Sequence, residues 1–245
     1  TIPDFMFRTA FTNETSMATF IDAIFTAMDN MMTLALENNA NLTRASFIAR
    51  KIKGGKPCGA INLLHEYNTL TNANLTVEGA LMNAEFLAWA SRSINLWVKR
   101  MSKMSVLFNE EGYKRHTPKD KLVVNLLQDF TSACDTFLGA NTFHDELVKL
   151  PMYDSVAYWQ GAGESFDFDD TSAINIKLDE QNTVSKKGII GVIYDYEAMG
   201  VTLNERRSTS ERNNHDEYTN YYNKANIGYF NDMSENGIVF YLEAV

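Results

Sequence analysis

The run of residues 188–195, Gly-Ile-Ile-Gly-Val-Ile-Tyr-Asp, is the feature that most constrains the fold. Apart from its glycines and final aspartate it is apolar on both faces, and a short run of that kind is typical of a strand covered on both sides. A second apolar run follows at residues 237–242. Between the two, residues 202–226 are rich in arginine, asparagine and tyrosine and carry almost no aliphatic side chains. We therefore expect two core strands that bracket a long loop.

Apolar residues at helical spacing precede this region and predict three helices. The first runs from Met17 to about Ile48 and is long enough to need a sheet or groove along which to lie. The second begins after Thr76 and ends near Glu110. For the third, Thr117 is the expected cap, Pro118 the first helical residue, and apolar spacing continues from Leu122 to Leu138.

Strand signals come mainly after these helices. Alternation at Ile174, Ile176 and Leu178 predicts one face of a strand. A chain that is helical first and rich in strands later is typical of the α+β class. Its 245 residues, 45% hydrophobic, are enough for one large domain or two modest ones.

Charge and composition exclude several functions. No apolar run approaches the roughly 18 residues of a membrane span. The net charge of −9 argues against a general nucleic-acid binder. The charge is uneven, because residues 92–121 hold eight basic side chains against three acidic ones. Such a basic belt on an acidic body can recognise an acidic partner, including another copy of the chain, or can simply be a solvated surface.

No cofactor or metal site is expected. Cys58 and Cys134 lack the spacing of a zinc site, and two cysteines are too few for a disulfide framework. The glycines at residues 53–59 do not form a phosphate loop, because Lys56 is followed by proline. The acidic run at residues 164–170 lacks the glycine and distal glutamate of a calcium loop.

The best enzymatic candidate is the pair Asp195 and Glu197, at the end of the predicted strand. Catalytic groups of α/β enzymes often occupy that position. No nucleophile, base or oxyanion donor can be identified beside the pair, however. An enzyme centred on these two carboxylates is therefore kept as an alternative.

The polar segment 202–226 indicates a protein interface instead. Long loops inside compact domains are usually functional or disordered, and arginine and tyrosine are enriched where proteins meet. Interleaved charges of both signs favour contact with another copy of the same surface. An exposed loop without a partner is the alternative. The expected interface residues are Arg206, Arg207, Arg212, Tyr221 and Tyr222.

Several segments resemble the major capsid proteins of small short-tailed bacteriophages of Gram-positive hosts. Residues 188–201, the arginine and asparagine segment with Tyr221 and Tyr222, and residues 229–240 carry the resemblance most clearly. It extends through further short motifs over nearly the whole chain, at residues 7–11, 85–91, 116–118, 141–145, 150–151 and 159–161.

The resemblance implies the Hong-Kong-type shell fold of tailed phages, with a spine helix, a peripheral sheet and an axial domain. Residues 1–60 would form the spine helix and part of the peripheral domain, and residues 61–187 a helical and axial part. Residues 188–245 would supply the final strands with the interface loop 202–226. An N-terminal arm and extended loop normally precede the spine helix, and almost no residues stand there in this sequence.

The function implied is that of a structural subunit, not an enzyme, which self-assembles into pentamers and hexamers of an icosahedral capsid. Such a shell encloses double-stranded DNA without sequence-specific binding. The expected partners are further copies of the chain, with scaffolding and portal proteins, and no membrane. The expected location is the virion, after assembly in the cytoplasm of the bacterial host. A nanocompartment shell of related fold is the second alternative.

Overall fold

The computed structural model describes residues 2–3, 14–54, 59–141, 150–160 and 165–244. Several features discussed above lie outside this part of the chain: the motif at residues 7–11, most of the motif at residues 141–145, Cys58, and Glu164 at the start of the acidic run. The chain divides into two compact units. Unit 1 comprises Thr1–Ala40 and Val201–Phe230, and unit 2 comprises Asn41–Gly200 and Asn231–Val245. The division into spine, axial and peripheral parts stays a prediction.

The long N-terminal helix is confirmed as α2, which runs from Glu14 to Lys53. It begins three residues before the predicted start at Met17. Its first part belongs to unit 1 and its last part to unit 2. In the last part Ala45, Phe47 and Ile48 are fully buried, so this end of the helix supplies a core face.

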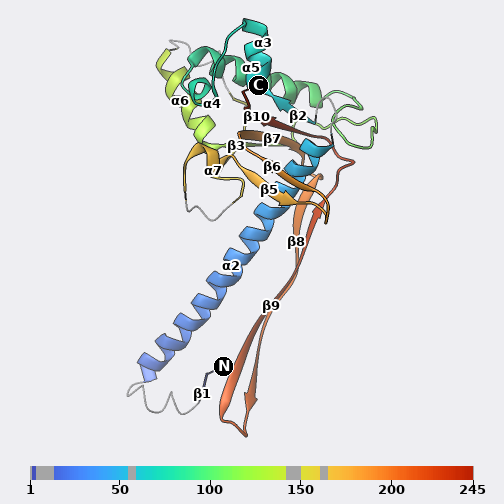
Figure 1. The fold of residues 1–245 in the computed structure, drawn as a ribbon. Coiled ribbons are helices and arrows are strands. Elements are labelled where there is room, and N and C mark those ends of the chain that lie inside the picture. Colours follow the sequence, from blue (N-terminus) through green and yellow to red (C-terminus); the bar gives the residue numbers. More distant parts are fainter. Residues whose placement is uncertain (1, 4–13, 55–58, 142–149, 161–164, 245) are drawn as a thin grey trace. The chain divides into compact units, whose positions relative to one another are not determined.

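Unit 1 contains a three-stranded sheet in the order β1-β9-β8 (Figure 1). Strand β1 is Ile2–Pro3, β8 is Met199–Asn213 and β9 is Tyr218–Asn231. The predicted loop at residues 202–226 is therefore wrong, because this segment is a long β-hairpin with its turn at residues 214–217. The two strands of a hairpin satisfy their backbone groups by hydrogen bonds to each other, so the hairpin does not need a face of aliphatic side chains. Such a face is the sequence pattern by which buried strands are recognised, and it is missing here.

Unit 2 is built on a five-stranded sheet in the order β2-β10-β7-β3-β4. Its strands are β2 (Ala60–Asn62), β10 (Gly237–Tyr241), β7 (Ile189–Asp195), β3 (Leu122–Leu127) and β4 (Asp154–Val156). Strand β7 is central and antiparallel to both β10 and β3. All its residues except Tyr194 are buried, which confirms the predicted covered strand.

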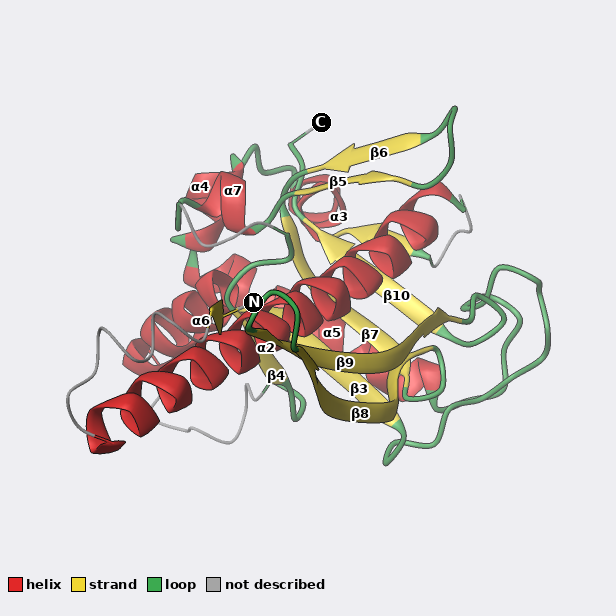
Figure 2. Ribbon diagram, turned by 90° about the horizontal axis from the view of Figure 1, so that it is seen from below, coloured by secondary structure: helices red, strands yellow, loops and turns green. Residues whose placement is uncertain are grey.

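Both faces of this sheet are covered, as Figures 1 and 2 show. Ile238 and Phe240 of β10 pack into the core beneath the helices, whereas Val239 packs into the core on the α2 side. The alternation reflects the two-residue period of a strand. The helical layer comprises α3 (Leu63–Thr71), α4 (Val77–Leu81), α5 (Ala84–Met101) and α6 (Gln128–Asn141). The opposite layer comprises the end of α2 and the hairpin of β5 (Ile174–Lys177) and β6 (Thr183–Lys186).

The strand predicted from Ile174, Ile176 and Leu178 is confirmed as β5. Ile174 and Ile176 are buried while Asn175 and Lys177 are exposed, which is the expected alternation. The mixture of helices and strands confirms the α+β class. The acidic segment contributes a single short helix, α7, at Phe168–Thr171.

Two helix predictions need correction. The helix predicted from Thr76 to Glu110 is two helices, because Thr76 caps only the short α4 and Asn83 caps α5 through its side-chain oxygen. The helix predicted after Thr117 is wrong in its first part, where Leu122–Leu127 forms strand β3. Helix formation starts only at Gln128.

Candidate functional site

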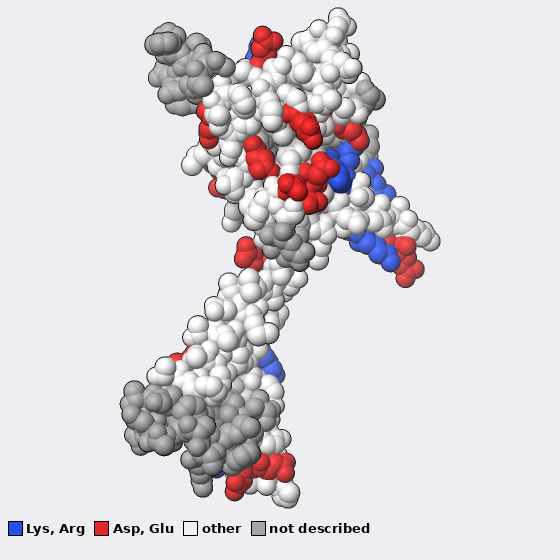
Figure 3. Space-filling model, turned by 60° about the vertical axis from the view of Figure 1, so that its left-hand side comes forward, with Lys and Arg blue, Asp and Glu red and all other residues white. Residues whose placement is uncertain are grey.

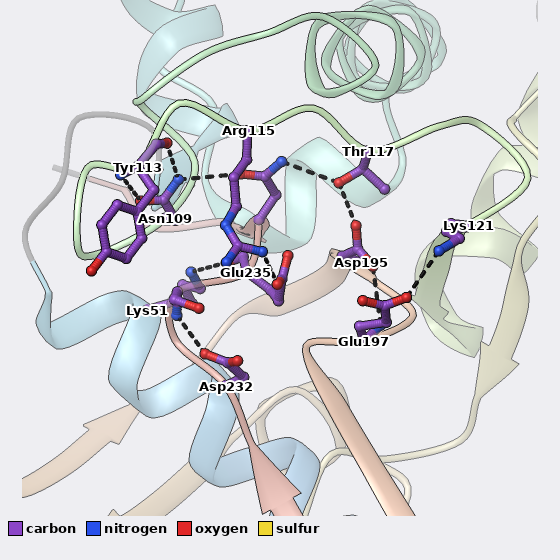
Figure 4. A network of polar contacts seen from close by, with 12 residues as sticks. Lys51, Asn109, Tyr113, Arg115, Thr117, Lys121, Asp195, Glu197, Asp232 and Glu235 are labelled. Atoms are coloured by element: carbon purple, nitrogen blue, oxygen red, sulfur yellow. Dashed lines mark hydrogen bonds and ion pairs between the residues drawn. The ribbon is translucent and has the colours of Figure 1, made fainter.

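Asp195, the last residue of β7, is buried, and both oxygens of its carboxylate accept hydrogen bonds within the fold. Oδ2 accepts a hydrogen bond of 2.7 Å from the Thr117 hydroxyl, and Oδ1 accepts one of 3.0 Å from the backbone N–H of Glu197. The Asn236 amide donates in turn to Thr117 Oγ1 at 3.1 Å. This chain of contacts, drawn in Figure 4, joins the end of β7 to the loop before β3 and the turn before β10.

Glu197 lies at the surface and pairs with Lys121, whose Nζ stands 2.9 Å from Glu197 Oε1. This hydrogen bond and charge lower the pKa of the Glu197 carboxyl, which keeps it ionised and weakens it as a base. The two candidate catalytic carboxylates therefore lie close together, but each is engaged by a neighbouring residue. This arrangement stabilises a loop and provides no poised acid or base.

Replacement of Asp195 by asparagine should lower the free energy of unfolding by about 1–2 kcal/mol, because one of two buried acceptors becomes an amide donor. Denaturant unfolding of the unassembled subunit would measure this loss. Glu197→Gln is the matched control, and we expect little change in its melting temperature, since exposed ion pairs contribute little. An unaltered unfolding curve for Asp195→Asn would contradict the structural role.

A shallow cleft of about 360 Å³ opens beside these residues. Its carboxylates are all engaged, since Glu235 pairs with Arg115, Glu197 with Lys121 and Asp195 with Thr117. Two exposed side chains at the rim, Lys114 and His116, form no ion pair with a carboxylate among the described residues. Lys114 is therefore a cation of the cleft that pairs with no carboxylate of the described residues.

The predicted interface residues lie on the hairpin of unit 1, where two of them contact α2. Arg206 of β8 pairs with Asp29 of α2, its Nη2 lying 2.6 Å from the carboxylate. Tyr221 of β9 packs edge to face on Phe25, with ring centroids 5.1 Å apart. Both contacts stabilise the hairpin against the helix within the same unit.

The neighbouring residues lie on the opposite face of the ribbon, as the two-residue period requires. The Arg207 side chain is 58% exposed and lies 3.8 Å from the carboxylate of Glu205 on the same strand. Tyr222 is 42% exposed, and Lys224 lies over its ring at 6.0 Å. Arg212 is exposed near the turn. Sequence reasoning grouped these five residues but could not separate those that contact α2 from those that face outward.

The described residues contain no cluster of three or more histidine, cysteine, aspartate or glutamate side chains that could hold a metal ion. Cys134 is buried, and burial raises its pKa to about 11, so its thiol is a core group and not a nucleophile. No helix in the described part of the chain is long and apolar enough to cross a membrane.

The structure is similar to a chain in the capsid structure of Staphylococcus phage Andhra, with a TM-score of 0.57 and 12% sequence identity. The match covers 99% of this chain and 68% of that chain. A comparison with curated protein sequences finds no match.

The chain belongs to the Phi29-like phage major capsid protein family, whose sequence model matches residues 1–241. It is therefore a structural subunit of a bacteriophage capsid and a component of the virion. The resemblance to phage capsid proteins that the sequence motifs indicated is confirmed, as is the similarity of the fold to a tailed-phage shell.

Proposed function

We propose that this subunit assembles with copies of itself into pentamers and hexamers of an icosahedral shell that encloses double-stranded DNA, and that it catalyses no reaction. The family match over residues 1–241 is the observation that carries this proposal. Scaffolding and portal proteins are the further partners, and assembly takes place in the cytoplasm of the host. Engagement of Asp195 and Glu197 by Thr117 and Lys121 supports a structural role for these carboxylates.

The outward face of the hairpin is the proposed contact with the next subunit. Arg207 and Tyr222 carry large, exposed side chains of the two types that interfaces favour. Arg206 and Tyr221 fix the hairpin to α2, through an ion pair with Asp29 and a ring contact with Phe25. Arg212, six residues after Arg206, falls on the face of Arg206 by the same alternation and is proposed as an interface residue nearer the turn. A stiff two-stranded ribbon loses less conformational freedom on contact than a loop would.

The direct test is assembly of the purified chain, alone and with the scaffolding protein of the same phage. Light scattering and negative-stain electron microscopy should show closed shells, with pentamers or hexamers as intermediates. A subunit that stays monomeric under every condition, scaffold included, would refute self-assembly.

Charge reversal on the hairpin can distinguish a residue that contacts the next subunit from one that stabilises the hairpin against α2. We expect Arg207→Glu to reduce the yield of shells while the melting temperature of the subunit is unchanged, because its side chain is exposed and pairs with a residue that is itself exposed. Arg206→Glu is the matched comparison, and it should lower the melting temperature as well, since it places a second carboxylate beside Asp29. Normal assembly of the Arg207→Glu variant would exclude this residue from the interface.

A further inference from the structure

The segment between α5 and β3, residues 102–121, exposes apolar side chains that the subunit does not cover. We call it the basic loop, since it forms most of the basic belt. Met104 is 61% exposed and Tyr113 is 53% exposed, with Val106 and Leu107 close to one half. Single exposed apolar residues are ordinary, but a group on one short segment marks a contact surface.

The basic loop is held by hydrogen bonds that are buried or partly buried. Ser105 and Arg115 exchange two backbone bonds across its neck. The Asn109 side chain bonds both the N–H and the carbonyl of Tyr113, at 2.8 and 2.7 Å (Figure 4). From the end of α2, the buried Lys51 ammonium donates to Phe108 O at 3.2 Å. A surface fixed in this way binds without first having to be ordered.

The same loop holds five basic side chains against three acidic ones, and three of its lysines are not neutralised by an ion pair among the described residues. Lys103, Lys114 and Lys119 are exposed and form no ion pair with a carboxylate in the described part of the chain. Lys114 also lines the adjoining cleft, whose three carboxylates are already engaged. An incoming carboxylate would therefore meet unpaired cations.

The apolar side chains decide which kind of partner fits. Nucleic-acid phosphates are bound by cations and polar groups, and Met104, Val106 and Leu107 would gain nothing from them. A protein with an acidic surface matches both properties. The chain itself has a net charge of −9 despite its basic belt, and Figure 3 shows a face of unit 2 on which acidic side chains predominate.

We propose that the basic loop docks on the acidic surface of a second copy of this chain, so that its apolar side chains are covered and its lysines lie opposite carboxylates of the neighbour. The inference rests on the proposed self-assembly and names a contact within it. This contact lies on unit 2 and is separate from the hairpin face of unit 1.

The test compares two double variants in shell assembly, followed by light scattering and electron microscopy. Lys114→Glu with Leu107→Ser changes the basic loop. Lys177→Glu with Leu70→Ser makes the same chemical change at exposed positions on β5 and α3. We expect the loop variant to give at least about tenfold fewer shells than the wild type, because like charges then face each other and apolar cover is lost. The control should assemble normally, and both should keep the melting temperature of the wild type.

Zero-length carbodiimide crosslinking of wild-type shells identifies the contact itself. In shells from mixed isotope-labelled and unlabelled subunits, we expect Lys103, Lys114 or Lys119 to be joined to an aspartate or glutamate of another subunit.

Three outcomes would overturn the inference. Normal shell yield from the loop variant alongside normal wild-type shells would reject the loop contact and leave self-assembly standing. Normal shells that retain less DNA would assign the loop to nucleic acid instead. Failure of the wild type itself to form shells would reject the proposed function, and the loop contact with it.

Discussion

Replacing Gly188 by alanine should lower the free energy of unfolding of the subunit by on the order of 3 kcal/mol. Gly188 has φ +77°, and a Cβ atom there would lie 2.1 Å from the carbonyl oxygen of Leu242. That oxygen belongs to the backbone, so it cannot turn away as a flexible side chain could. To relieve the clash, the start of β7 must move away from Leu242, which directly follows β10.

Gly112 provides a control for the backbone conformation alone. Its φ is +75°, but no heavy atom lies within 4 Å of the position that a Cβ would take. Gly112→Ala should therefore cost only the strain of a left-handed alanine, about 1 kcal/mol. Denaturant unfolding of the two unassembled variants separates the steric cost from the conformational one. Equal losses for the two variants would show that the approach of Leu242 contributes nothing.

The elements that could be predicted from the sequence are those whose pattern has one interpretation. Residues 189–195 are apolar on both faces and too short for a buried helix, so only a covered strand fits. The long periodic run in α2 is equally clear. Around Ile174 and Ile176 the strict alternation excludes a helix. In each case local spacing alone carries the necessary information.

The errors occurred where a distant partner decides the structure. Thr117 followed by Pro118 has the pattern of a helix start, but the Thr117 hydroxyl is bound by Asp195, 78 residues away. The run Leu122–Leu127 fits a helical spacing as well as a strand, and pairing with β7 selects the strand. Such tertiary partners cannot be identified from local spacing.

The hairpin of unit 1 shows the same limit at the candidate site. Composition predicted Arg206 and Tyr221 to be interface residues, because arginine and tyrosine are enriched at interfaces. Their partners Asp29 and Phe25 lie far back in the sequence on α2. Strand alternation would have divided the residues into two faces, but only after the segment had been recognised as strand and not loop.

The largest pH-dependent effect should come from Lys51, which is 2% exposed at the end of α2. Its ammonium donates to the carbonyl oxygens of Phe108 and Glu235, both at 3.2 Å. Burial lowers the pKa of Lys51 from 10.5 to about 8, opposed by the charges of Glu110, Asp232 and Glu235. The folded subunit thus releases this proton at a lower pH than the unfolded chain does.

The sign of the effect follows from that difference. Between pH 8 and 10.5 the unfolded chain holds more protons than the folded one, so Lys51 makes the free energy of unfolding rise with pH. The gain should reach about 2–3 kcal/mol by pH 10 and vanish below pH 8. Denaturant unfolding of the unassembled subunit between pH 7 and 10 would measure it against a variant without the group.

Lys51→Met is that variant. Near pH 7 its stability should be close to that of the wild type, because the lost hydrogen bonds are offset by removal of a buried charge. By pH 10 it should be the less stable protein, since only the wild type gains from releasing the proton. Lys53→Met, at an exposed position two residues further along α2, should follow the wild type throughout. A difference between Lys51→Met and the wild type that stays constant with pH would show that Lys51 keeps an ordinary pKa, and that the pocket beneath the basic loop stabilises the ammonium as well as water does.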